Sequence, residues 1–68
     1  MDRQTLIRRI TTANNGKVFV TQTQGAKILG MGKDTFREMM KGYDYKVTGK
    51  GKAKNYLVDD VADAFMRS

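Results

Sequence analysis

TQTQGAKILGMGKDTFREMMK, residues 21–41, is the stretch of the sequence that decides the fold. Thr21 followed by Gln24 matches a capping box, in which each side chain hydrogen-bonds an amide at the start of a helix. The GMG triplet predicts a tight turn, because glycine accepts a positive φ angle and is tolerated at the N-cap of the next helix. Lys33 to Lys41 predicts a second short helix, with Gly42 ending it. Two short helices joined in this way are typical of a helix-turn-helix.

Each of these helices has one apolar side. In the first the apolar residues are Ala26, Ile28 and Leu29, and in the second they are Phe36, Met39 and Met40, at spacings of three and four. The outward positions of the second helix are mostly charged: Lys33, Asp34, Arg37, Glu38 and Lys41. Gly25 is unfavourable inside a helix by about 1 kcal/mol relative to alanine. We expect it to permit the close approach of a neighbouring element.

An added N-terminal helix is predicted within residues 1–16. Asp2 is its N-cap, and Asn14-Asn15-Gly16 ends it, since Asn and Gly accept the left-handed conformation. Its apolar face is formed by Leu6, Ile7 and Ile10, with Arg3, Arg8 and Arg9 on other faces. The arginines form either a solvated basic face or, at Arg8 or Arg9, a contact to a phosphate. Lys17 to Val20 predicts a brief strand.

Residues 43–58 predict a β-hairpin wing. Its strands are Tyr43 to Thr48 and Lys54 to Val58, with a flexible tip of glycine and lysine between them. Alternation with polar residues indicates a half-buried first strand, with Tyr43, Tyr45 and Val47 on one side. Asp59 is expected to cap a closing helix over residues 59–68, whose apolar face comprises Val61, Ala62, Phe65 and Met66. The predicted fold is an α+β winged helix-turn-helix domain spanning residues 1–68, with three helices, a hairpin wing and the added N-terminal helix.

Composition favours a polyanionic partner over catalysis. Thirteen Lys+Arg against seven Asp+Glu give a net charge of +6 and a pI near 9.9. The chain has no cysteine and no histidine, so it offers no disulfide, no nucleophilic triad and no ordinary zinc site. Its glycine-lysine runs lack the spacing of a nucleotide-binding P-loop. We expect a protein that is not an enzyme, with no cofactor, no metal, no small-molecule substrate and no membrane segment, located in the cytoplasm.

The candidate DNA-binding residues lie on the second helix of the pair and on the wing. An α-helix fits the major groove of B-DNA. The candidates on the helix are Lys33, Asp34, Thr35, Arg37 and Lys41, and those on the wing are Lys50, Lys52 and Lys54. Like-charged pairs four residues apart on the helix, Lys33–Arg37 and Asp34–Glu38, favour a functional face slightly over an ordinary solvated one. The three wing lysines alternate, so an extended strand would point them the same way. A solvated loop is the alternative, and Thr35 also suits a packing role.

From Val18 to Met66 the sequence resembles the MerR-like winged helix of phage excisionases. The residues that carry the resemblance are VFVTQTQGAKILGMGKDTFREMM, the lysine hairpin, and YLVDDVADAFM. Gly25 and Gly32 depart from the family pattern, which has an alanine or acidic residue and a serine cap there. The resemblance implies a protein that binds double-stranded DNA near an attachment site, bends it, and assists a tyrosine-type integrase, with further copies of itself on the DNA in a bacterial host.

Other roles share this fold. The same winged helix begins terminase small subunits and occurs in transcriptional repressors, so terminase-like or repressor-like DNA binding is the first alternative. The second is a basic module that binds an acidic protein. With one helix after the wing, the chain is expected to act as a free-standing accessory DNA-bending protein.

Overall fold

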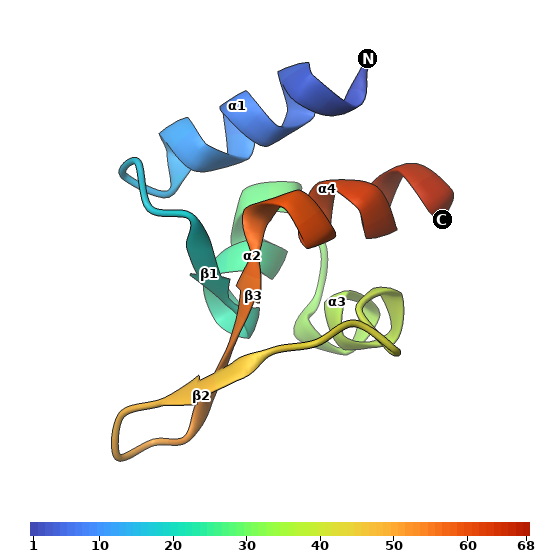
Figure 1. Ribbon diagram of the computed structural model, residues 1–68. Helices are drawn as coiled ribbons and strands as arrows, with labels where there is room; N and C mark the ends of the chain where they lie inside the picture. Colours follow the sequence, from blue (N-terminus) through green and yellow to red (C-terminus); the bar gives the residue numbers. More distant parts are fainter.

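Four helices and a three-stranded antiparallel sheet make up the protein in a computed structural model, which describes residues 1–68 (Figure 1). The elements in chain order are α1 (Arg3–Ala13), β1 (Phe19–Thr21), α2 (Gln22–Leu29), α3 (Lys33–Met39), β2 (Lys46–Thr48), β3 (Ala53–Leu57) and α4 (Val58–Arg67). The strand order is β1-β3-β2, with Val20 opposite Tyr56 and Val47 opposite Lys54. The protein is therefore an α+β domain, and none of its helices has the length and apolar character needed to cross a membrane.

The sequence correctly predicts the side-chain cap at the start of α1 and the left-handed backbone that follows its end. The Asp2 carboxylate accepts a hydrogen bond from the backbone N–H of Thr5 at 2.7 Å, and this bond lowers the Asp2 pKa. Asn15 and Gly16 adopt positive φ angles after the helix. Asn14 is buried, and its amide donates to the carbonyl oxygens of Lys17 (3.1 Å) and Phe19 (2.6 Å). Asn14 thus joins the end of α1 to the start of β1, a role the sequence did not indicate.

The α2–turn–α3 segment forms largely as predicted. Thr21 Oγ1 accepts a hydrogen bond from the N–H of Gln24 at 3.1 Å. The Gln24 side chain does not hydrogen-bond the N–H of Thr21, so only one of the two hydrogen bonds of a capping box is present. Gly30 takes the left-handed conformation at φ 68°, and the N–H of Met31 bonds the carbonyl of Ala26 at 2.9 Å. The prediction that the second helix reaches Lys41 is wrong: it ends at Met39, because the N–H of Lys41 bonds the Glu38 carbonyl three residues back and tightens the turn.

The hairpin projects from the rest of the molecule (Figure 1). Its first strand is shorter than predicted, Lys46–Thr48, and every residue of it is exposed. The predicted half-buried face is wrong beyond Tyr43: Tyr45 is 48% and Val47 54% exposed, because this part of the hairpin extends past the core. Of the two hairpin strands, only β3 contributes a buried side chain to the core, that of Tyr56.

The closing helix begins earlier than predicted. It follows β3 directly, with Leu57 at the N-cap and no side-chain cap, so Asp59 lies in the first turn and the predicted Asp59 cap is wrong. The buried face is Val58, Val61, Ala62 and Ala64. Phe65 and Met66 were expected on that face, but they are 39% and 48% exposed, because the last turn of α4 leads away from the core to the C-terminus.

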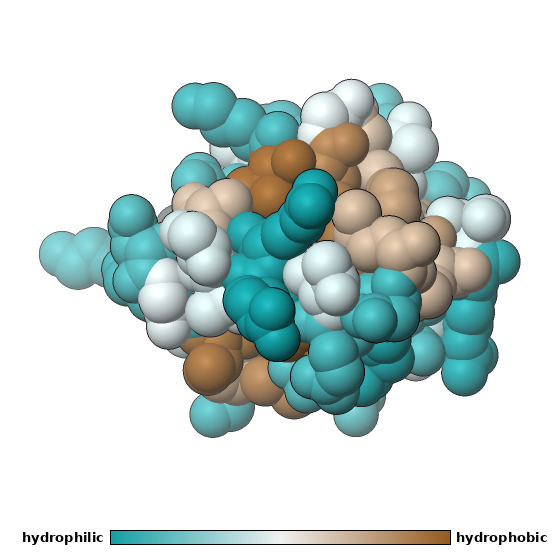
Figure 2. Space-filling view, turned by 90° about the horizontal axis from the view of Figure 1, so that it is seen from above, coloured by the Kyte–Doolittle hydropathy of each residue, from teal (hydrophilic) through white to brown (hydrophobic).

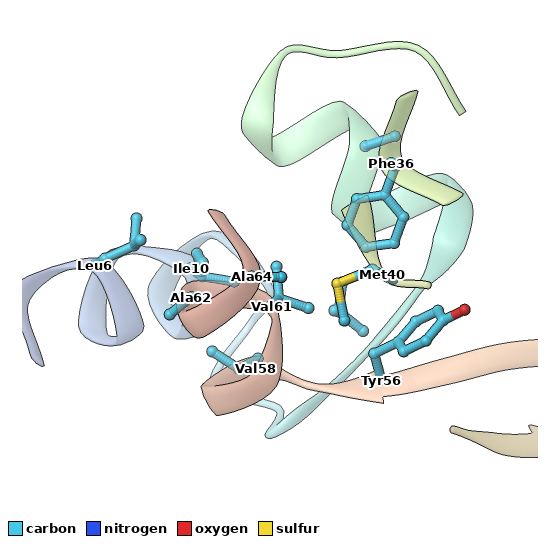
Figure 3. Packing of buried hydrophobic residues seen from close by; sticks show 11 residues of the cluster. Leu6, Ile10, Phe36, Met40, Tyr56, Val58, Val61, Ala62 and Ala64 are labelled. Atoms are coloured by element: carbon cyan, nitrogen blue, oxygen red, sulfur yellow. The ribbon is translucent and has the colours of Figure 1, made fainter. Parts of the chain in front are cut away.

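The core joins every helix and strand except β2. Eleven buried apolar residues form it: Leu6, Ile10, Val20, Ala26, Phe36, Met40, Tyr56, Val58, Val61, Ala62 and Ala64. Figure 3 shows Met40 between the rings of Phe36 and Tyr56, with Val61 of α4 beside it. The core therefore holds α3 against both β3 and α4.

Candidate nucleic-acid interface

A series of aromatic contacts fixes the hairpin beside α3. The rings of Phe36 and Tyr56 meet edge to face with centroids 5.8 Å apart. Tyr56 in turn contacts Tyr45, again at 5.8 Å, and the Lys54 ammonium lies 4.8 Å from the centre of the Tyr45 ring. The position of Lys54 relative to α3 is thus set by packed side chains and not by a free loop.

We call the hollow between the start of α2, the start of α3 and the hairpin the basic groove. Its volume is about 310 Å³, and its lining residues are Gln22, Thr23, Lys33, Arg37, Lys52, Ala53 and Lys54. Four of the seven carry a positive charge and none carries a negative one. Such a groove attracts a polyanion, because its charges reinforce one another.

A second hollow, which we call the tyrosine groove, adjoins the first. Its volume is about 370 Å³, and it is lined by Arg37, Glu38, Met40, Lys41, Gly42, Tyr43, Tyr45, Lys54 and Tyr56. Arg37 and Lys54 line both grooves and form the ridge between them. Burial raises the pKa of Tyr56 and the neighbouring Tyr45 raises it further, while Arg37 acts in the opposite direction. Tyr56 therefore remains an uncharged phenol at neutral pH.

Ion pairs on α3 change the electrostatic argument made from the sequence. Arg37 Nη2 lies 3.1 Å from Asp34 Oδ1, and Lys41 Nζ lies 3.8 Å from Glu38 Oε2. Repulsion between the like-charged pairs on this helix is therefore offset by opposite charges three residues apart. The repulsion does not support the inference that this face of the helix is functional. Both pairs are exposed, so each contributes about 1 kcal/mol or less to stability. Lys33, Lys52 and Lys54 belong to no ion pair.

The structure brings together half of the eight candidate residues. Lys33, Arg37, Lys52 and Lys54 line the basic groove, and Lys41 lines only the tyrosine groove. The others line neither: Asp34, Thr35 and Lys50. The side chain of Asp34 is 95% exposed. Thr35 is exposed as well, which excludes the packing role considered for it.

The expected alignment of the wing lysines is wrong. Lys50 and Lys52 lie in the turn between β2 and β3, and only Lys54 lies on a strand. Gly49 and Lys52 have φ angles of 73° and 53°, and the N–H of Lys52 bonds the Gly49 carbonyl at 3.3 Å. This backbone is not extended, so alternation does not direct the three side chains to one face.

Several residues that line the two grooves were not among the sequence candidates, and three of them are Gln22, Thr23 and Tyr45. Gln22 and Thr23 line the basic groove from the first turn of α2. The signal for Gln22 and Thr23 was the Thr21 cap, which places them in the first turn of a helix. Tyr45 lines the tyrosine groove, but its alternation with polar residues suggested burial instead.

In comparisons with known proteins, no family model, curated protein or solved structure matches the chain. No group of three His, Cys, Asp or Glu side chains lies together in a way that could hold a metal ion. What the site offers chemically is positive charge, amide and hydroxyl groups, and aromatic surface.

Proposed function

We propose that the protein is a winged-helix protein that binds double-stranded DNA. The observation that carries this proposal is the basic groove, in which α3 and the hairpin together supply four positive side chains and no negative one. The order of elements supports it as well, since two short helices joined by a turn precede a β-hairpin and a further helix. In this proposal α3 enters the major groove, and the hairpin follows the adjacent phosphate backbone.

The residues divide into two roles. Arg37 has the guanidinium geometry for two hydrogen bonds to guanine, and it would read base edges together with Lys33. Lys52 and Lys54 would bind phosphates, which position the protein without reading sequence. Gln22 and Thr23 are suited to phosphate contacts at the start of α2, where amide and hydroxyl groups face the same groove.

Within this class we propose an excisionase of a phage or integrative element, acting in the host cytoplasm. The support for this narrower role is the resemblance of Val18 to Met66 to the excisionase winged helix. The protein would bend attachment-site DNA and assist a tyrosine-type integrase. A footprint on the attachment region of the element tests this role: protection there agrees with it, and protection at a packaging site or promoter instead contradicts it.

The test of DNA binding itself is a salt titration on duplex DNA. If α3 and the hairpin together neutralise about five phosphates, the logarithm of the binding constant falls with the logarithm of the salt concentration at a slope of about −4 to −5. A slope near zero contradicts the proposal, because binding would then release no counterions. Binding of an acidic protein in place of duplex DNA at physiological salt contradicts it as well.

A further inference from the structure

The outward side of α1 forms a second cationic surface. Gln4, Arg8 and Thr12 are exposed at intervals of four residues, and Arg9 is exposed beside them. We call these four residues the α1 arginine surface. Neither arginine takes part in an ion pair, although three such pairs form elsewhere in the protein. Asp2 is the only acid within residues 1–17, and it is engaged by the N–H of Thr5 at the N-cap. The other acids of this part of the molecule lie on α4, which packs against α1, and one of them, Asp63, is paired with Arg67.

Charge is divided between the two ends of the molecule. Residues 1–17 contain four bases and one acid, and residues 42–57, which include the hairpin, likewise contain four bases and one acid. Residues 58–68, which include α4, contain one base and three acids. The two positive segments are therefore not parts of one continuous basic sequence, and an acidic helix follows the second of them.

The α1 arginine surface lies far from the basic groove. Figure 1 shows α1 at the opposite end of the molecule from the hairpin, with α4 packed below it. The view from above, onto the end that carries α1, shows hydrophilic side chains crossing the surface between separate hydrophobic areas (Figure 2). The molecule measures 35 × 24 × 20 Å, so a straight duplex bound in the basic groove does not reach the outward side of α1.

The chemistry of the α1 arginine surface fits phosphate better than protein. A guanidinium presents paired N–H donors that match a phosphate, and glutamine and threonine add uncharged hydrogen-bonding groups. Protein interfaces are anchored by apolar or aromatic side chains at their centre. Of the large apolar residues of α1, Leu6 and Ile10 are buried and Ile7 is partly buried against the core. The four residues of the α1 arginine surface are themselves polar or charged, so this surface has no such anchor at its centre.

We propose that the α1 arginine surface binds the phosphate backbone of a second duplex segment, so that one molecule bridges two stretches of DNA. This inference rests on the proposed function, which supplies the first duplex. A protein with this activity holds two DNA segments side by side without forming a dimer.

The experiment uses one duplex fixed to beads and a second, fluorescent duplex in solution, with the full chain added between them. Protein on the beads reports binding of the first duplex, and fluorescence on the beads reports bridging. Arg8→Ala with Arg9→Ala should lower the captured fluorescence by about tenfold while the amount of bound protein stays nearly unchanged. Both residues are exposed and alanine is the better helix former, so α1 persists in this variant.

Lys27→Ala is the control. It removes an exposed positive charge that lies outside the hairpin and lines neither the basic groove nor the α1 arginine surface, and it should leave capture near the wild-type level. Protein bound without fluorescent duplex overturns the bridging inference and leaves the proposed function standing. Equal capture by wild type and the arginine variant also overturns it, because bridging would then arise elsewhere. Absence of protein from the beads overturns the proposed function itself.

Discussion

The backbone of Gly25 lies directly against the ring of Phe36. A Cβ atom on Gly25 would lie 2.6 Å from Cζ and 2.7 Å from Cε2 of that ring. Phe36 is completely buried and packs edge to face on Tyr56, so the ring has little freedom to withdraw. The glycine that weakens α2 locally therefore sets how closely α2 and α3 approach, as the sequence led us to expect.

Gly25→Ala should destabilise the protein although alanine favours helix. The gain in helix propensity is about 1 kcal/mol, while overpacking a rigid core costs about 1–3 kcal/mol. Because the added Cβ would lie well under 3 Å from a fully buried ring, we expect a cost towards the upper end of this range. The free energy of unfolding should then fall by about 1–2 kcal/mol in urea denaturation followed by circular dichroism. Gly51→Ala is the control, because no atom lies within 4 Å of the added Cβ and stability should change little. An unchanged or raised stability of Gly25→Ala would show that the ring can move.

Local rules account for the parts of the fold that were predicted, and tertiary geometry accounts for the parts that were not. Thr21 and Gly30 act on neighbouring backbone groups, so their roles follow from sequence spacing. The exposure of Tyr45 depends on how far the hairpin extends beyond the core, which no local pattern encodes. Lys52 adopts a positive φ angle that is uncommon outside glycine. Its side-chain direction therefore could not be predicted from the alternation of residues along an extended strand.

In the candidate site as well, the sequence predicts the type of residue, whereas the tertiary structure decides which residues lie together. Arg37 and Lys52 could be selected as cationic from the sequence alone, but their meeting in one groove requires the packing of Phe36 on Tyr56. The pairing of Arg37 with Asp34 depends on which of two helical spacings the side chains use. Gln22 and Thr23 carry no charge, and only the groove geometry brings them into the site.

Asp34→Asn should strengthen binding to every duplex. Asp34 holds the Arg37 guanidinium at 3.1 Å, so removing its charge frees Arg37 for phosphate or base contact and raises the net charge by one. We expect a several-fold rise in affinity and a steeper salt slope, with a loss of stability below about 1 kcal/mol. Asp44→Asn makes the same change of charge outside both grooves. If the two variants bind equally well, net charge alone explains the effect.

Arg37→Ala should relax sequence preference more than it weakens overall binding. A bidentate contact to guanine discriminates against other bases by about 1–3 kcal/mol, and a lysine-to-phosphate contact does not. The measurement is the ratio of affinities for the footprinted site and a scrambled duplex, which we expect to fall towards one. Lys27→Ala, an exposed position outside both grooves, should keep the ratio. A preserved ratio in Arg37→Ala would assign the base contact to another side chain.

Lys52→Ala should weaken binding to all duplexes alike. The lysine lies in the hairpin turn and lines the basic groove, where it would meet the phosphate backbone. We expect the salt slope to become shallower by about one, since one fewer counterion is released. Lys52→Arg keeps the charge on the same backbone and should keep the slope. Loss of preference between sequences in Lys52→Ala, with an unchanged slope, would contradict a phosphate role.

Tyr43→Phe should lower stability at neutral pH and lose this effect in alkali. The Tyr43 hydroxyl donates to Asp63 Oδ2 at 2.7 Å, and this bond raises the Tyr43 pKa above its ordinary value of 10. Because the folded-state pKa is the higher one, the stabilisation is fully present below pH 10 and is lost as the pH rises through the folded-state value. The Tyr43 tyrosinate would then face the Asp63 carboxylate with the same charge.

Urea denaturation of wild type and Tyr43→Phe between pH 7 and about pH 11 measures this difference. We expect a constant gap in the free energy of unfolding up to about pH 9, followed by convergence of the two proteins. Tyr45→Phe is the matched control, because the Tyr45 hydroxyl forms no hydrogen bond within the protein and its removal should change stability little at neutral pH. A gap that persists unchanged at the highest pH would mean that packing of the Tyr43 ring, and not its bond to Asp63, holds the loop after α3 against α4.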